Sequence, residues 1–451
     1  MPGAIAHPTR KLSEMEDGAF REVDVPFDAH NAKTVHASLG GSLRGISARR
    51  TVAARHGVVS AQTAASPSIS YENSNVCNLS VYHPPDLIGQ VSRRLVVGSV
   101  LIVVGTLVVS YHRQMTSQSL ILTLHGVAKE FDGDWSQAGY WRDPQGAWRP
   151  LHGDRLNDIE EVCLQLHDAF AASLFGKLAY YHALLPGIPD FLIIGGLNSE
   201  CSLSREQFEQ AMVKLKNFPH LHRLLYLYDC RQLVAGIQEC TKEVCFLVGE
   251  FYRILNLEEL FFPAAVESDG TRYCTSPVVT TLVAVLNMVY VRLHSLLDYV
   301  TKLGVEIEKL RDVFNTYPKL ASSGTLFGVH KRLDWGDRTG TLFEDCDTVH
   351  EVELFRNQII HDGLLDDMPK AYKVVKDGIA IEKFILLPNR VDGQFARYRN
   401  RHLFFGTEDK INLRLPRLLE DFQSKQLATL GELLKKLRGR SPQDPSIDTP
   451  A

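Results

Sequence analysis

One stretch of the chain combines side chains that suit phosphate chemistry. It runs Glu351-Val-Glu-Leu-Phe-Arg-Asn-Gln-Ile-Ile-His-Asp-Gly363 and contains Arg356, Asn357 and His361. An imidazole takes or gives a proton near neutral pH, and a guanidinium matches phosphate oxygens in bidentate geometry. With an amide beside them, these groups suit cleavage of a phosphodiester: the histidine moves protons, and the arginine stabilises the charge that develops on phosphorus.

The spacing in this stretch predicts a helix that carries the three side chains near its end. Apolar residues recur at i, i+3 and i+7 and would form its core-facing stripe: Val352, Phe355 and Ile359. Asn357 and His361 are four residues apart and therefore share one face, which the long side chain of Arg356 also reaches. Gly363 suits the position just past a helix. A histidine in a last helical turn also complements the helix dipole without any catalytic role, and this simpler interpretation stands beside the catalytic one.

Arg356-Asn357-x-x-x-His361 on a helix within an all-α region resembles the Arg-x(4–6)-His signature of the HEPN superfamily (higher eukaryotes and prokaryotes nucleotide-binding domains). A polar residue commonly follows the arginine in that family, as Asn357 does here. The resemblance covers about Pro277–Lys436, and nothing before Leu151 shares it. It implies a metal-independent endoribonuclease that works as a homodimer with two such motifs facing each other, of the kind found in toxin–antitoxin, abortive-infection and CRISPR-linked systems. Other members have lost catalysis and serve as binding or assembly modules.

A second stretch, Arg397-Tyr-Arg-Asn-Arg-His402, is the strongest local cationic patch in a chain whose formal net charge is −4. We expect Arg397, Arg399 and Arg401 to contact RNA phosphates, with Arg390 nearby. Neighbouring aromatic side chains would stack on bases: Tyr398, Phe404 and Phe405. The alternative is a solvated loop on an otherwise neutral surface.

The rest of the sequence offers no cofactor or metal motif. It contains no Walker A loop, no GxGxxG after a strand and no GxSxG elbow, so ATPase, dinucleotide-enzyme and α/β-hydrolase functions lack support. The eight cysteines form no CxxC pair, which argues against a zinc ribbon and a thioredoxin-like redox site. His220-x-His222 lacks a third ligand close in sequence. We therefore expect no metal and no small-molecule cofactor. Scattered cysteines in a chain of this length are typical of a reduced, cytoplasmic compartment.

The composition is that of a globular protein with two or three folding units. The chain has 451 residues, of which 45% are hydrophobic and 23% charged. Hydrophobic periodicity predicts a mainly α fold, with helices over Asp158–Leu184, Ser204–Lys216, Leu221–Leu255, Pro277–Thr316, Val349–Asp362 and Arg417–Leu437. A β-hairpin is expected over Tyr372–Leu387, with its turn at Lys376-Asp377-Gly378. We divide the helical part into a region 151–270 and a HEPN-like helical bundle 271–440, followed by a tail 441–451.

The segment before the helices has a different character. Residues 1–90 show weak hydrophobic periodicity and predict a poorly ordered N-terminus. Residues 91–150 predict a small β-containing or membrane-proximal region. Its most apolar run, Leu95–Tyr111, leaves two interpretations open: two buried strands, continued by Ser119–Leu124, or a membrane-spanning helix at the lower limit of length. We expect Trp135–Gly153 to form a loop.

The motif suits phosphodiester cleavage, and the resemblance to the HEPN superfamily implies a metal-independent endoribonuclease that acts in stress response or phage defence, with RNA as its partner. Arg356, Asn357 and His361 would be its catalytic residues. The alternative, from a different functional class, is a noncatalytic helical interaction or dimerisation protein. A membrane anchor through Leu95–Tyr111 is compatible with either function.

Overall fold

The structure is a computed structural model that describes the backbone of residues 11–16 and 19–24, and residues 120–440 except 263–267, 364, 402 and 407–408. The chain divides into two compact units after Val81. In the first unit, β1 (Lys11–Glu16) and β2 (Ala19–Asp24) form an antiparallel hairpin. The rest of the predicted leader, the apolar run Leu95–Tyr111 and the tail after Arg440 lie outside the described residues.

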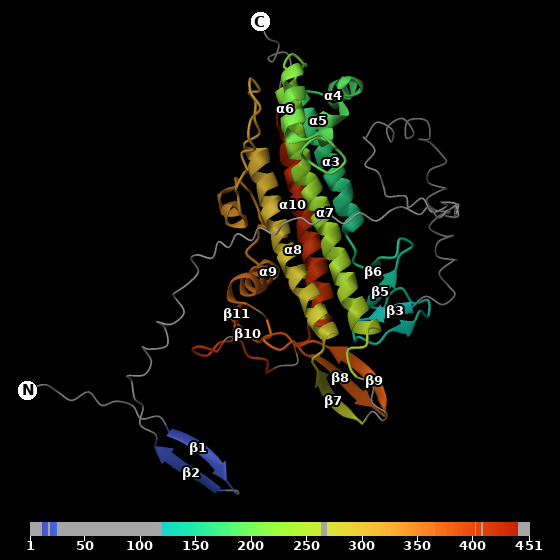
Figure 1. Cartoon of the computed structure of the whole chain (residues 1–451), viewed down its shortest axis with the longest axis vertical. Helices are drawn as coiled ribbons and strands as arrows, with labels where there is room; N and C mark the ends of the chain where they lie inside the picture. The colour runs from blue at the N-terminus through green and yellow to red at the C-terminus, as the bar shows by residue number, and fades with distance from the viewer. Residues whose placement is uncertain are drawn as a thin grey trace, which may run out of the picture. The chain divides into compact units, whose positions relative to one another are not determined.

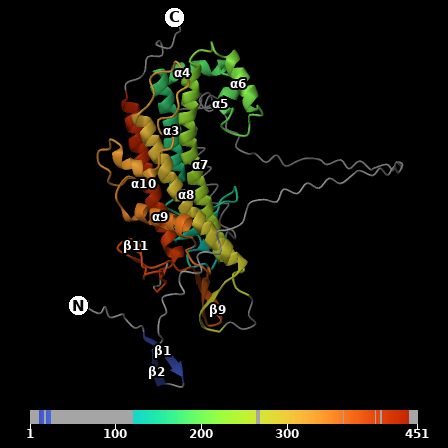
Figure 2. The same ribbon diagram turned by 60° about the vertical axis from the view of Figure 1, so that its left-hand side comes forward.

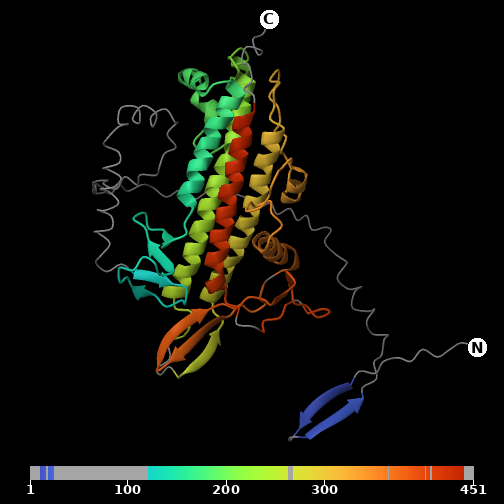
Figure 3. The same ribbon diagram turned by 180° about the vertical axis from the view of Figure 1, so that it is seen from behind.

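The described part of the second unit is built on a bundle of long helices (Figures 1 and 3). These helices are α3 (Leu156–Phe175), α7 (Leu221–Leu257), α8 (Pro277–Glu308) and α10 (Ile411–Gly439). Their buried faces form one continuous hydrophobic core, since each presents an apolar stripe at helical spacing. Residues 151–270 and 271–440 therefore contribute helices to a single core, and the mainly α expectation is confirmed.

Shorter helices cover the end of the bundle where α3 finishes (Figure 2). They are α4 (Leu178–Leu184), the 3₁₀ turn η1 (Leu185–Gly187), α5 (Asp190–Ile194) and α6 (Arg205–Lys214). The helix predicted over Asp158–Leu184 is broken at Gly176, whose φ of 75° belongs to the left-handed region. Helix α6 begins as predicted, because Ser204 and Gln207 form a reciprocal capping box.

Helix α9 (Asp347–Asn357) packs against α8 and continues as the π-helix η3 (Gln358–Asp362). The predicted core-facing stripe is confirmed: Val352 and Phe355 are fully buried, and Ile359 packs against the core. Helix α8 ends at Glu308 instead of Thr316, and the chain then runs through the 3₁₀ helix η2 (Phe327–Arg332) before α9 begins. These elements place the end of α9 beside the middle of α8.

A three-stranded antiparallel sheet lies at the other end of the bundle (Figure 1). Its strands are β7 (Gly270–Cys274), β8 (Ala371–Lys376) and β9 (Ile379–Phe384). The predicted hairpin is confirmed, and its turn residues Asp377 and Gly378 both have positive φ, as a tight two-residue hairpin turn requires. The sequence did not predict β7. A further short hairpin, β10 (Arg390–Val391) and β11 (Gln394–Phe395), follows β9 in the chain.

Another small sheet packs beside α7, with the strand order β4-β3-β5-β6. The strand predicted over Ser119–Leu124 is confirmed as β3 (Leu120–Thr123). The loop predicted over Trp135–Gly153 is wrong, because β5 (Gly139–Arg142) and β6 (Trp148–Pro150) pair within it, while β4 (Lys129–Glu130) forms the edge. The physical reason is packing: Tyr140 is buried and stacks on Tyr252 of α7, with 4.3 Å between ring centroids.

Among the described helices, α8 is long and apolar enough to cross a membrane. It packs against α7, α9 and α10, and the core helix of a bundle meets the same criteria of length and hydropathy. The structure is compatible with a soluble or a membrane-associated protein, and the cytoplasmic location stays a prediction.

The contact between α7 and β6 yields a test of this packing. A Cβ atom on Gly249 would lie 2.3 Å from the carbonyl oxygen of Trp148, whereas a Cβ atom on Gly236 of the same helix meets nothing within 4 Å. We expect Gly249→Ala to lower the free energy of unfolding by about 1–3 kcal/mol through overpacking. Gly236→Ala should raise it by about 0.5–1 kcal/mol, because alanine favours a helix. Urea unfolding measures both, and changes of the same sign would contradict this packing.

Candidate active site

Arg356 holds the other two residues of the predicted motif. Its Nη1 atom lies 3.0 Å from Nε2 of His361 and 3.0 Å from Oδ1 of Asn357. A guanidinium has only donors, so Nε2 accepts, and the imidazole in this arrangement is neutral with its proton on Nδ1. Arg356 is half-buried, whereas Asn357 and His361 are exposed. The three predicted catalytic residues therefore meet at a surface that a substrate can approach.

The π-helix explains why Arg356, and not Asn357, contacts His361. The prediction assumed α-helical spacing, in which residues four apart are neighbours. In η3 the backbone pattern widens to i→i+5, and Arg356 and His361 are five residues apart. Asn357 therefore binds the guanidinium and makes no hydrogen bond with the imidazole. Such single-turn widenings are rare and often lie at functional sites.

A buried carboxylate fixes the helix that carries this motif. Glu351 is 3% exposed and accepts hydrogen bonds from Arg414 Nε at 2.8 Å, Arg390 Nη1 at 2.9 Å and the Tyr290 hydroxyl at 3.1 Å. Burial raises the pKa of Glu351, while the Arg390 guanidinium lowers it. Beside this network the ring of Phe355 stacks on that of Tyr290, with centroids 4.5 Å apart. Arg390, which we expected near the RNA-facing patch, has its guanidinium engaged with this carboxylate.

The predicted cationic stretch is attached directly to the π-helix. Arg397 Nη2 donates to Gln358 Oε1 at 2.6 Å and lies 3.1 Å from Asp362 Oδ2. The loop therefore borders the histidine of the motif. Arg397 is partly neutralised by this ion pair, whereas Arg399 and Arg401 are exposed. The predicted stacking residues are exposed as well: Tyr398 and Phe404 at 59% and 43%, and Phe405 at 37%.

The structure adds two residues that sequence reasoning missed. His294 and Asp298 lie one turn apart on α8, with 3.8 Å between Nδ1 and Oδ2 and 14% and 19% exposure of their side chains. Oδ1 of Asp298 accepts a hydrogen bond from the backbone N–H of Phe327 at 2.7 Å. Burial lowers the pKa of His294, the Asp298 carboxylate raises it in part, and the charge of Arg356 lowers it further. Their i, i+4 spacing was the available sequence signal, but only the packing of α8 against α9 connects it to the motif.

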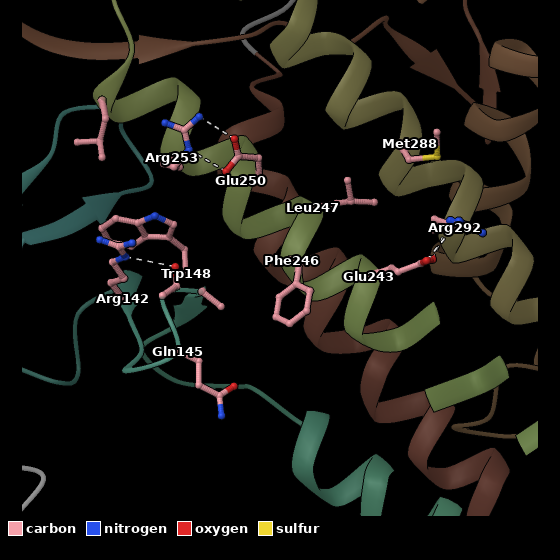
Figure 4. Close-up of a pocket in the computed structure, with 13 residues that line it drawn as sticks. Arg142, Gln145, Trp148, Glu243, Phe246, Leu247, Glu250, Arg253, Met288 and Arg292 are labelled. Atoms are coloured by element: carbon pink, nitrogen blue, oxygen red, sulfur yellow. Dashed lines mark hydrogen bonds and ion pairs between the residues drawn. The ribbon is translucent and has the colours of Figure 1, made fainter. Parts of the chain in front are cut away.

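A groove of about 900 Å³ lies elsewhere, between the β5–β6 turn and one face of α7 and α8 (Figure 4). Its charged side chains already have partners: Arg253 with Glu250, Arg292 with Glu243, and Arg142 with the carbonyl of Gly146. Phe246 projects into it and is 49% exposed. The side chains that line it include no histidine, cysteine, serine or threonine, and its two carboxylates, Glu243 and Glu250, are paired with arginines.

Within the described part of the chain, no group of His, Cys, Asp and Glu is arranged to hold a metal ion. Comparison with protein-family models, with curated proteins and with solved structures finds no match. Function must therefore be inferred from the geometry and electrostatics of the site.

The network around Glu351 predicts a large effect on stability. Glu351→Gln removes a buried charge from two guanidinium groups, and breaking a buried pair in this way costs about 3–5 kcal/mol. The matched control is Glu432→Gln, which removes an exposed carboxylate that pairs with Lys435 on the surface of α10. We expect a clearly lower urea midpoint for Glu351→Gln and a nearly unchanged one for the control. Equal midpoints would show that the buried network does not hold α9.

Proposed function

We propose that the protein is a metal-independent endoribonuclease of HEPN type, with Arg356, Asn357 and His361 as its catalytic residues. The observation that carries the proposal is the contact between a guanidinium and a neutral imidazole at an exposed helix end, beside a loop rich in arginine. Because the motif resembles that of the HEPN superfamily, we further propose that the protein is a prokaryotic homodimer that acts in stress response or phage defence.

The proposed reaction uses the 2′-hydroxyl of RNA as the nucleophile. Its oxygen attacks the adjacent phosphorus, the bond from phosphorus to the 5′-oxygen breaks, and the products are a 2′,3′-cyclic phosphate and a 5′-hydroxyl. Arg356 turns from Nε2 of His361 to the phosphate and stabilises the charge of the transition state. Asn357 keeps hold of the guanidinium, and the released imidazole of His361 can then transfer a proton.

The arginine-rich loop would hold the strand that is cleaved. Arg399 and Arg401 are exposed for phosphate contacts, and the exposed rings of Tyr398, Phe404 and Phe405 suit stacking with unpaired bases. We therefore propose single-stranded or looped RNA as the substrate, since bases in a duplex are stacked on one another and withheld from such rings.

The second candidate is a noncatalytic interaction protein. The groove beside α7 favours it, because Phe246, Met288 and Leu257 together leave apolar surface exposed there, at 49%, 45% and 41%. The two candidates differ in what they predict for RNA: only the first requires cleavage.

Removing the motif's acid–base or electrostatic group tests the first candidate. His361→Ala and Arg356→Ala should each lower the cleavage rate about 10²-fold or more, with an unchanged fold, because neither side chain belongs to the core. EDTA should not inhibit the wild type, and its products should carry 2′,3′-cyclic phosphates. The control is His350→Ala, which removes an exposed histidine of the same helix that pairs with Asp345.

Cleavage assays with labelled RNA and purified protein give the readout. A wild-type protein that binds RNA and never cuts it would favour the interaction protein. Cleavage that survives His361→Ala would place the active site elsewhere.

The contribution of the arginine-rich loop is measured by the salt dependence of RNA binding. Replacing Arg399 and Arg401 together with alanine should weaken binding and flatten the log–log salt slope by about 1.4, at about 0.7 for each single-strand phosphate contact. Adding Arg397→Ala should lower affinity further, although that residue also binds Asp362. Lys435→Ala with Arg438→Ala, at the far end of α10, is the charge-matched control. An unchanged slope in the loop variant would assign the loop to the solvated surface.

A further inference from the structure

We propose that His294 is the second acid–base residue of this site: it takes the proton of the 2′-hydroxyl, while His361 gives a proton to the leaving 5′-oxygen. This inference rests on the proposed function and deepens it, because it places both proton-transfer groups in a single copy of the chain. The two imidazoles would flank one guanidinium, that of Arg356.

The packing of α8 against α9 brings His294 to this position. Tyr290 of α8 meets α9 twice, through its stacked contact with Phe355 and its hydrogen bond to Glu351. His294 lies one helical turn beyond Tyr290 on the same face, and Arg356 directly follows Phe355. The lowered pKa of His294, to which the charge of Arg356 contributes, is consistent with this proximity.

Asp298 lies beside the His294 ring. Its Oδ2 atom faces Nδ1 at 3.8 Å, and its other oxygen is held by the backbone N–H of Phe327. A carboxylate on the Nδ1 side leaves Nε2 as the nitrogen that can meet a substrate. From α9, the charge of Arg356 acts on His294. Glu353 of α9 faces Asp298 and, from η2, Lys331, while His350 and Asp345 also act on it.

The chemistry calls for two groups, because in an in-line displacement the attacking and leaving oxygens lie on opposite sides of phosphorus. One imidazole cannot serve both oxygens at once. His294 is the better base, because burial of its ring lowers its pKa and favours the neutral form. His361 is exposed, and its Nε2 becomes free to carry a proton once Arg356 turns to the phosphate. The proton that His294 accepts and the proton that His361 gives up balance the reaction.

An RNA with sulfur in place of the bridging 5′-oxygen separates the two roles, because a thiolate leaves without needing a proton. With ordinary RNA, His294→Gln and His361→Ala should each be slower by about 10²-fold or more. With the sulfur-bridged RNA, His361→Ala should regain most of the wild-type rate, and His294→Gln should stay slow. His294→Gln should also lose the acid-side fall in rate of the wild type, which the lowered pKa of His294 places at a pH below the ordinary histidine range. His350→Gln serves as the control histidine, and melting curves with RNA-binding measurements confirm that each variant is folded.

Three results would contradict different parts of the proposal. A wild type that cleaves neither RNA would defeat the proposed function itself. Wild-type cleavage that is lost in His361→Ala and unchanged in His294→Gln would overturn only the role of His294. Rescue of His294→Gln by the sulfur-bridged RNA would make His294 the acid and overturn its role as the base.

Discussion

The buried carboxylate of Glu351 is the interaction on which the arrangement of the site depends. It joins Tyr290 of α8, Arg390 of β10 and Arg414 of α10, which are far apart in the sequence and meet at one point on α9. A carboxylate that is 3% exposed is costly unless its hydrogen bonds are made, and here each oxygen has partners. Because those partners come from three other elements, the direction of α9 is fixed and its last residues are carried to the surface beside α8.

The same network reaches the arginine-rich loop. Arg390 anchors the chain where that loop begins, and Arg397 returns it to the π-helix at Gln358 and Asp362. The loop therefore starts at the carboxylate that positions α9 and closes next to the histidine that α9 presents. Two ion pairs, Arg390 with Glu351 and Arg397 with Asp362, hold the loop so that its exposed arginines lie at the site. The two arginines in these pairs are less available to bind phosphate.

Local sequence patterns predicted those parts of the structure that local forces decide. Period-3.6 apolar spacing located the long helices, and the Asp377-Gly378 turn located the β8–β9 hairpin. The prediction started the last helix at Arg417, whereas α10 begins at Ile411 and contains Pro416. Proline cannot donate to the carbonyl of Asn412, and that carbonyl accepts the Tyr252 hydroxyl instead. The β5–β6 hairpin depends on a partner more than a hundred residues away, and the Glu351 network on partners several tens of residues away. No local pattern specifies such distant contacts.

The candidate site likewise combines parts that the sequence predicted with parts that it did not. Arg356, Asn357 and His361 were predicted from residue types and spacing, since chemistry at one helix end is local. The sequence did not predict that Arg356 contacts His361, because no residue pattern marks the change from α-helical to π-helical geometry at Gln358. His294 was missed for a different reason: its helix has the apolar spacing of a core element, and many residues of α8 are indeed buried in the core. The hydrogen bond between Tyr290 and Glu351 turns one face of α8 toward α9, and His294 lies one turn beyond Tyr290 on that face. A short motif can thus supply a cation and one imidazole by itself, but only tertiary packing can set another helix, with a second imidazole and a neighbouring carboxylate, against it.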